Sequence, residues 1–368
     1  MLRRRRARHL DPANHAGPVP APATAPAPAY ARGDDLQTII AAIDEMTRLG
    51  RSGQSERARA LGEDVLARAR RTLGPDHDLT LKAATNLATA LAELGDHQRA
   101  LELHEDTLPR LRRTKGDDHP HTLMEAGGLV DALSVTGDHW RACELGADTL
   151  ERRRRVHGPD HPDALTSAHN LSVDLSRVGD HARARDLAED TLERSRRVFG
   201  ADHPRTLDAA ATLATALHGL GDHEGARARH EDTLERRRRV LGADHPDTLT
   251  SANNLGITLN ELGAHGRAKA VFEEAHSRAR QRFGDDHPRT LVAASNLALT
   301  ERKLGDAHRA RELDEDALER RRRVLGDDHP LTLRSAESLA LDLRLLGDHR
   351  EADHWESWAS SRRPASPA

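Results

Sequence analysis

Residues 242–284 read GADHPDTLTSANNLGITLNELGAHGRAKAVFEEAHSRARQRFG, a stretch from which the helical fold can be predicted. Its first half carries an apolar residue every three or four positions, which predicts one apolar stripe along a helix over 246–262. The stripe consists of Leu249, Ala252, Leu255 and Leu259. Gly263 follows, where a left-handed helix end favours glycine. A second helix is expected over about 267–283, so the stretch predicts a helix pair.

The same pattern returns along the chain at a constant spacing, without an insertion. One series of glycines marks the end of each second helix: Gly74, Gly116, Gly158, Gly200, Gly242, Gly284 and Gly326. A proline follows four residues later in most repeats, where the first turn of a helix tolerates it, and the preceding Asp-His pair can supply the cap. Chance does not keep such a register, so the chain is an array of helix pairs.

The array is expected to contain about eight helix-turn-helix repeats over residues 34–363. Their boundaries lie near 34–74, 75–116, 117–158, 159–200, 201–242, 243–284, 285–326 and 327–363. Residues 1–33, rich in arginine, proline and alanine, are expected to form a disordered tail, and 364–368 a disordered end. Trp355 and Trp358 lie three apart in the last repeat, where they cap the array or form a dimer seam.

A repeat of about 40 residues also occurs in other helical arrays and in propellers, but the alternating pattern of strands is missing here. The stretch NLATALAELGDHQRA at 86–100 resembles a tetratricopeptide repeat, and GADHPDTL at 242–249 is similar to the longer kinesin-light-chain type. This resemblance extends over about 34–360. It implies an all-α fold, a right-handed α-solenoid, whose first helices line a concave groove that receives peptides or partner helices.

The composition excludes several classes of protein. The chain has 368 residues, with 56 Lys and Arg against 60 Asp and Glu, and this near balance argues against a protein built mainly to hold nucleic acid. No segment approaches the roughly 20 apolar residues that cross a bilayer, so we expect a cytoplasmic protein without a membrane partner. The single cysteine excludes a disulfide framework. Arginine far outnumbers lysine, which favours a GC-rich, actinobacterial genome.

Neither a metal site nor a catalytic site is expected. The 24 histidines recur in register, but those of adjacent repeats are separated by a helix pair and cannot converge on one metal ion. Capping and packing are the favoured roles of these histidines, and proton sensing is the alternative. No lysine precedes Ser or Thr, as a phosphate-binding loop requires. The sequence therefore predicts a non-enzymatic protein without a cofactor.

Arginine runs occupy 152–155, 236–239 and 320–323, near the ends of second helices. Acidic residues precede many of these arginines by four positions, as Asp148 precedes Arg152 and Glu151 precedes Arg155. That order stabilises a helix by about 0.2–0.5 kcal/mol for each pair. We therefore favour a solvated, salt-bridged helix face. A surface for nucleic acid or an acidic partner is the alternative, although no aromatic residues lie among the arginines for base stacking.

The candidate binding residues lie on first helices, at positions that vary between repeats. In one register the resemblance implies an asparagine that hydrogen-bonds the ligand backbone. A further register of the first helices is aliphatic in the later repeats. Basic side chains gather at the C-terminal end of the predicted groove. The predicted partner-binding residues are Asn86, Asn170, Asn253, Asn254, Asn296, Ile257, Leu299, Arg302 and Arg334. Lys303 and Arg344 add to the positive end. The alternative is that the asparagines only brace neighbouring helices.

The sequence thus predicts a non-enzymatic scaffold that binds a protein or peptide segment in its groove, with the apolar and acidic part of that segment toward the last repeats. One rival is the sensor arm of a signalling or defence ATPase whose catalytic domain lies on a separate chain. A less favoured rival is a nucleic-acid adaptor.

Overall fold

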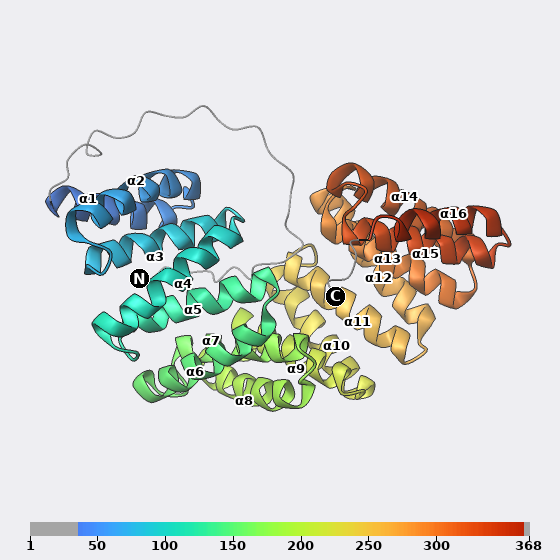
Figure 1. Ribbon diagram of the computed structural model, residues 1–368. Helices are drawn as coiled ribbons and strands as arrows, with labels where there is room; N and C mark the ends of the chain where they lie inside the picture. Colours follow the sequence, from blue (N-terminus) through green and yellow to red (C-terminus); the bar gives the residue numbers. More distant parts are fainter. Residues whose placement is uncertain (1–35, 364–368) are drawn as a thin grey trace. The chain divides into compact units, whose positions relative to one another are not determined.

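The computed structural model describes residues 36–363, and its regular structure in that range consists of sixteen helices with no strand (Figure 1). The first helices of the repeats are α1 (Leu36–Arg51), α3 (Asp78–Glu93), α5 (Pro120–Thr136), α7 (Pro162–Arg177), α9 (Pro204–Gly219), α11 (Pro246–Glu261), α13 (Pro288–Leu304) and α15 (Pro330–Leu345). The second helices are α2 (Ser55–Leu73), α4 (His97–Lys115), α6 (His139–His157), α8 (His181–Phe199), α10 (His223–Leu241), α12 (His265–Phe283), α14 (Ala307–Leu325) and α16 (His349–Ser360).

The helix pair predicted from 242–284 is confirmed as α11 and α12, although α12 begins two residues before the expected position. Gly263 between them has a φ of 73°, which confirms the expected positive φ. The all-α prediction is likewise confirmed for the described residues. The predicted disordered segments, 1–33 and 364–368, lie outside that range.

The described residues divide into two compact units, 36–198 and 199–363. In the N-terminal unit, α3 packs against α2 and α4 and also contacts α1 and α5. In the C-terminal unit, α13 packs against α12 and α14 and also contacts α11. Successive first helices therefore touch one another within each unit. We call the surface formed by the odd-numbered helices the first-helix face.

The core consists mainly of leucine and alanine side chains. Alanines that recur once in each repeat on the second helices are almost completely buried, among them Ala100, Ala142 and Ala268. Leucines of the first helices, such as Leu133 and Leu259, pack beside them. Phe272 is an aromatic exception in this core, because its ring is fully buried in the C-terminal unit.

Seven histidines cap the first helices. In each case Nδ1 of the histidine accepts a hydrogen bond from the backbone N–H two residues later, at 3.1–3.2 Å. The capping residues are His77, His119, His161, His203, His245, His287 and His329. The expectation that the Asp-His pair supplies the cap is confirmed for the histidine, whereas the aspartate of the pair binds arginine. Asp118, for example, accepts hydrogen bonds from Arg152 and Arg155.

The buried His230 gives a prediction about pH. Desolvation is the main cause that lowers the pKa of this α10 side chain to about 4. The unfolded chain takes up the proton near pH 6.5, so the folded protein loses stability as pH falls from 6.5 toward 4. At pH 5 the loss is about 2 kcal/mol. The difference in urea-unfolding free energy between wild type and His230→Leu should change by that amount between pH 7 and pH 5. A constant difference would contradict the assignment.

Candidate partner-binding face

The predicted asparagines lie on the first-helix face, and most of them bind the preceding first helix. Nδ2 of Asn86 donates to Thr47 Oγ1 at 3.0 Å, and Nδ2 of Asn170 donates to Asp131 Oδ1 at 2.8 Å. Nδ2 of Asn296 donates to Asn253 Oδ1 at 2.6 Å. These amides therefore brace adjacent repeats, the alternative that the sequence left open. Whether their remaining polar atoms also contact a ligand stays a prediction.

Asn254 differs from the other members of its register. It is half-buried on α11, and within residues 36–363 its side chain makes no hydrogen bond. Its amide offers both a donor and an acceptor to a ligand backbone. Of the five asparagines, Asn254 is thus the one whose loss would remove ligand contacts without breaking a bond between repeats.

Three aliphatic side chains occupy one register on α11, α13 and α15. Ile257, Leu299 and Leu341 are 36%, 40% and 50% exposed, and we call them the aliphatic strip. The same register in the N-terminal unit holds the exposed Thr89 and Asp131. Val173 on α7 and Thr215 on α9 complete the register, which is thus mostly polar as far as α9 and aliphatic on α11, α13 and α15.

The positive end of the groove is largely neutralised by internal pairs. Arg302 was predicted to contact a ligand, but its guanidinium binds Asp342 at 2.5 Å and Asp314 at 3.0 Å within the chain. The reason is that the side chain points between α14 and α15, toward two buried carboxylates. Lys303 lies 3.7 Å from Glu261, and Arg344 binds Glu356 at 2.8 Å. Arg334 remains, exposed and without an ion-pair partner among the described residues.

The arginine runs are not uniformly solvated, which corrects the predicted salt-bridged face. One arginine in each run turns inward and joins two first helices through hydrogen bonds to a serine hydroxyl and to backbone or carboxylate oxygens. These side chains are Arg153, Arg237 and Arg321, which occupy the same position in alternate repeats. A run of four arginines does not reveal which member is buried. The signal that could have found it is the serine that recurs in step on the following first helix, as Ser167, Ser251 and Ser335.

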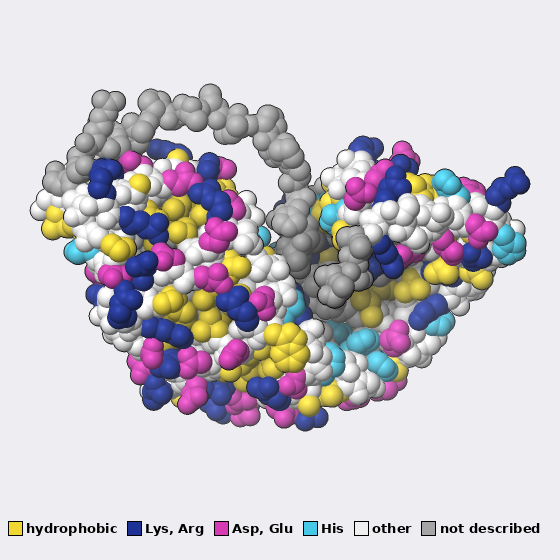
Figure 2. All heavy atoms as spheres, in the orientation of Figure 1, with side chains coloured by type: hydrophobic (Ala, Val, Ile, Leu, Met, Phe, Trp, Pro, Cys, Tyr) yellow, Lys and Arg dark blue, Asp and Glu magenta, His cyan; other side chains and the backbone are white. Residues whose placement is uncertain are grey.

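The outward arginines form ion pairs with acidic residues. Arg152 binds Asp148 four residues earlier at 2.8 Å, which confirms that predicted spacing. Arg155 binds Asp118 at 2.6 Å instead of the expected Glu151. Ion pairs also link successive second helices, as Arg154 with Asp190 at 2.8 Å. Figure 2 shows basic and acidic side chains interspersed on each unit. No large surface of one sign is visible on that face to favour nucleic acid.

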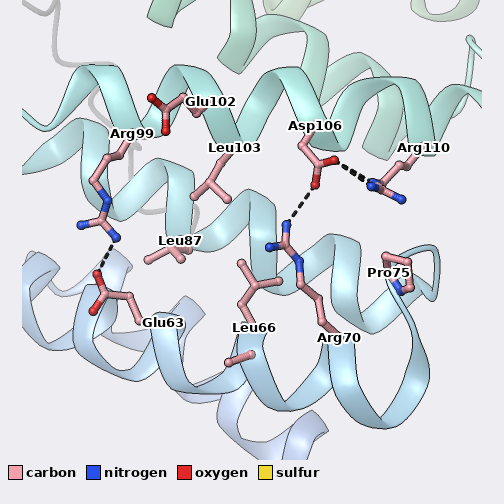
Figure 3. A pocket seen from close by; sticks show the side chains of 11 residues that line it. Glu63, Leu66, Arg70, Pro75, Leu87, Arg99, Glu102, Leu103, Asp106 and Arg110 are labelled. Atoms are coloured by element: carbon pink, nitrogen blue, oxygen red, sulfur yellow. Dashed lines mark hydrogen bonds and ion pairs between the residues drawn. The ribbon is translucent and has the colours of Figure 1, made fainter.

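A pocket of about 700 Å³ lies between α2 and α4. Its floor consists of Leu66, Leu87 and Leu103 (Figure 3). Ion pairs cross it near both ends, one between Arg99 and Glu63 at 2.8 Å and one between Arg70 and Asp106 at 2.9 Å. These mutual pairs satisfy four charges of the rim, whereas Glu102, which also lines the pocket, has no ion-pair partner among the described residues.

Chemistry-bearing residues do not converge in the described part of the chain. Between residues 36 and 363, no group of three or more His, Cys, Asp or Glu side chains could hold a metal ion. Desolvation is the main cause that raises the pKa of the half-buried Cys143 to about 11, so its thiol stays protonated at neutral pH. None of the helices in this range has the length and apolar character that a bilayer crossing requires.

The two C-terminal tryptophans pack on the last repeat. The rings of Trp355 and Trp358 lie edge to face with centroids 5.5 Å apart, against the buried leucines and alanines of α15 and α16. The guanidinium of Arg362 lies over the ring of Trp358 at 4.5 Å. These contacts describe a capping arrangement within one chain. The dimer seam remains the alternative prediction.

Comparison with known proteins gives a family match along most of the chain. A family model described as Tetratricopeptide repeat matches residues 49–113, 122–196, 174–238, 208–281, 267–320 and 289–365. No curated protein sequence matches.

Solved structures share the fold at low sequence identity. The chain is similar to BtubC (BKLC) from P. vanneervenii, with 19% identity, coverage of 62% of this chain and 96% of that one, and a TM-score of 0.53. A Rap protein complexed with competence and sporulation factor shows 12% identity, 89% and 98% coverage, and a TM-score of 0.57. A tetratricopeptide repeat protein from Parabacteroides merdae shows 14% identity, 83% and 99% coverage, and a TM-score of 0.59.

Proposed function

The chain belongs to the tetratricopeptide-repeat family, and we propose that its repeats are of the kinesin-light-chain-like type and that it binds an extended segment of a partner protein on its first-helix face. Proteins of this family serve as interaction scaffolds and are generally not enzymes. The observation that carries the proposal is the aliphatic strip on α11, α13 and α15.

The strip defines the kind of segment that fits. Packed helices lie about 8–10 Å apart, and an extended chain in the polyproline II conformation advances about 3.1 Å per residue with three residues per turn. A segment that crosses α11, α13 and α15 therefore places every third side chain over a strip residue. Asn254, beside Ile257 on α11, is placed to bond the backbone of such a segment. Arg334 on α15 favours an acidic residue near the end of the segment over the last repeat.

One structural neighbour supports a binding role by analogy. The Rap protein named above is complexed with competence and sporulation factor, and it has the same type of repeat fold. At 12% identity this likeness concerns the fold, so the partner of the present chain has to be identified by experiment.

The proposal predicts a loss of capture when the strip becomes polar. Affinity capture from the native cell extract, read by mass spectrometry, should lose the partner at least tenfold with Ile257→Ser, Leu299→Ser and Leu341→Ser combined, because each buried aliphatic side chain contributes about 1.5–3 kcal/mol. Circular dichroism checks that the helices remain.

A matched control lies on the second helices. Val156, Val198 and Val240 are 42%, 40% and 41% exposed, and they also share one register. Their combined replacement by serine should leave capture unchanged. Equal loss with both triple variants, or no loss with the strip variant, would contradict the proposal. A captured protein with a nucleotide-binding loop would favour the sensor-arm role.

A further inference from the structure

Two adjacent glycines interrupt the middle of α5. Gly127 and Gly128 each cost about 1 kcal/mol relative to alanine in a helix interior. A Cβ at Gly127 would come within 2.7 Å of Arg153 Nη2, and a Cβ at Gly128 within 2.6 Å of His104 Cε1. Both glycines therefore leave room for a basic side chain from a neighbouring second helix.

The two basic groups differ in their partners. His104 Nδ1 lies 2.8 Å from Glu125 Oε1, so the imidazole already has a carboxylate. Arg153 has neutral acceptors: its Nη1 donates to Ser167 Oγ at 2.5 Å and to the Asp163 carbonyl at 3.4 Å, and its Nη2 donates to the Leu123 carbonyl at 2.7 Å. Among residues 36–363, no carboxylate lies within ion-pair distance of Arg153.

Arg237, the equivalent arginine two repeats later, has the carboxylate partner that Arg153 lacks. It occupies the position of Arg153 two repeats later, and it makes the same bonds to a serine, Ser251, and to a backbone carbonyl. Its Nη2, however, donates to the carboxylate of Asp208 at 2.5 Å. The residue of α5 that corresponds to Asp208 is Met124, which is exposed. The fold thus accepts a carboxylate against this guanidinium, and α5 does not supply one.

The third arginine of this set, Arg321, is closed to a ligand. It is buried, and its Nη1 donates to Ser295 Oγ at 3.0 Å, in the register where Arg153 has Gly127. Arg153 is half-buried, with no side chain from Gly127 to cover it. Desolvation is the main cause that lowers the pKa of Arg153 from its usual value. Asp163 and Asp131 oppose that effect through space, and Asp131 is itself bonded to Asn170.

We propose that Arg153, beneath Gly127 on the first-helix face, binds a carboxylate of the partner segment in the place that Asp208 takes beside Arg237. The inference rests on the proposed function and names a second contact for the same partner class. Three of the five guanidinium N–H groups are used by the chain, which leaves two for a carboxylate.

The test is an NMR titration of the full-length, ¹⁵N-labelled protein. The probes are N-acetyl-glutamate amide for a side-chain carboxylate, N-acetylglycine for a chain-terminal carboxylate, and N-acetyl-glutamine amide as the neutral match. We expect saturable shifts of the Arg153 Nε–Hε and the Gly127 and Gly128 amide resonances with one or both carboxylates, and none with the glutamine probe. The carboxylate probe whose titration has the lower midpoint concentration shows whether the partner's carboxylate belongs to a side chain or to a chain terminus.

Met124→Asp is the decisive variant, because it supplies the carboxylate that Asp208 provides at Arg237 and changes an exposed side chain. In this variant the dissociation constant of the carboxylate probe should rise at least tenfold, while the circular dichroism spectrum stays unchanged. The combined variant Ile257→Ser, Leu299→Ser and Leu341→Ser should bind the carboxylate probe as the wild type does. Loss of carboxylate binding at Arg153 can therefore be distinguished from loss of partner binding on the aliphatic strip. No shifts at these resonances, equal shifts with the glutamine probe, or an unchanged titration in Met124→Asp would overturn the proposal.

Discussion

Replacement of Phe272 by alanine is expected to lower the free energy of unfolding of the C-terminal unit by about 3–5 kcal/mol. The Phe272 ring is fully buried on α12 and packs in the cluster that includes Leu255, Leu259 and Leu297. Because most of the surrounding core is leucine and alanine, no other large side chain can fill the cavity. Urea unfolding followed by circular dichroism measures the loss, and Val240→Ala, at an exposed position, should change it by less than about 0.5 kcal/mol.

Gly256 provides a sharper form of this prediction. A Cβ at Gly256 would lie 2.4 Å from Phe272 Cζ, so Gly256→Ala should destabilise the wild type by about 1–3 kcal/mol through overpacking. In the Phe272→Ala background the same methyl group enters the cavity, and Gly256→Ala should become neutral or stabilising. A double-mutant cycle should therefore give a coupling energy above about 1 kcal/mol. Additive effects would show that the two residues do not pack as described.

Replacement of Arg302 by leucine should cost about 3–5 kcal/mol at pH 8, because it leaves two buried carboxylates without their cation. Asp314 and Asp342 are 1% and 0% exposed, and both bind the Arg302 guanidinium. Desolvation, and next the Asp342 charge, hold the pKa of Asp314 above its usual value. When the pKa of a carboxyl group is higher in the folded protein than in the unfolded chain, the folded protein loses stability as pH rises. The reason is that the unfolded chain releases the proton at a lower pH. The cost of Arg302→Leu should therefore be smaller at pH 5 than at pH 8.

Arg334→Leu is the matched control for Arg302→Leu. Arg334 is exposed on α15 without an ion-pair partner among residues 36–363, so its loss should change stability by less than about 0.5 kcal/mol at either pH. Urea-unfolding midpoints of both variants at pH 5 and pH 8 measure the difference. If Arg302→Leu behaved like Arg334→Leu, the buried ion pairs would not be structural.

The repeat made most of the fold predictable, whereas single positions on it were harder to interpret. The spacing of Leu249, Ala252, Leu255 and Leu259 predicts α11 because an apolar stripe every three or four residues can be buried only by a helix. The burial of Phe272 could not be predicted in the same way. It depends on a small partner, Gly256, on another helix.

The candidate site was predicted in part. The aliphatic strip and the first-helix position of the asparagines follow from registers that vary between repeats. The inward turn of Arg302 does not, because its acceptors, Asp314 and Asp342, lie on other helices. A signal was nevertheless present: Arg302 bonds a residue 40 positions later, as Ser134 does with Asp174 and Asn260 with Thr300. A search for polar pairs at that separation would have assigned Arg302 to the contacts between repeats.

Site-specific photo-cross-linking shows whether a partner lies on the first-helix face. A benzophenone amino acid replaces Leu299 on α13 in one sample and Val240 on α10 in another, two positions of 40% and 41% exposure. Irradiation with the captured partner should give a cross-linked product from position 299 and none from position 240. A product from position 240 with none from 299 would place the partner on the second helices and contradict the account.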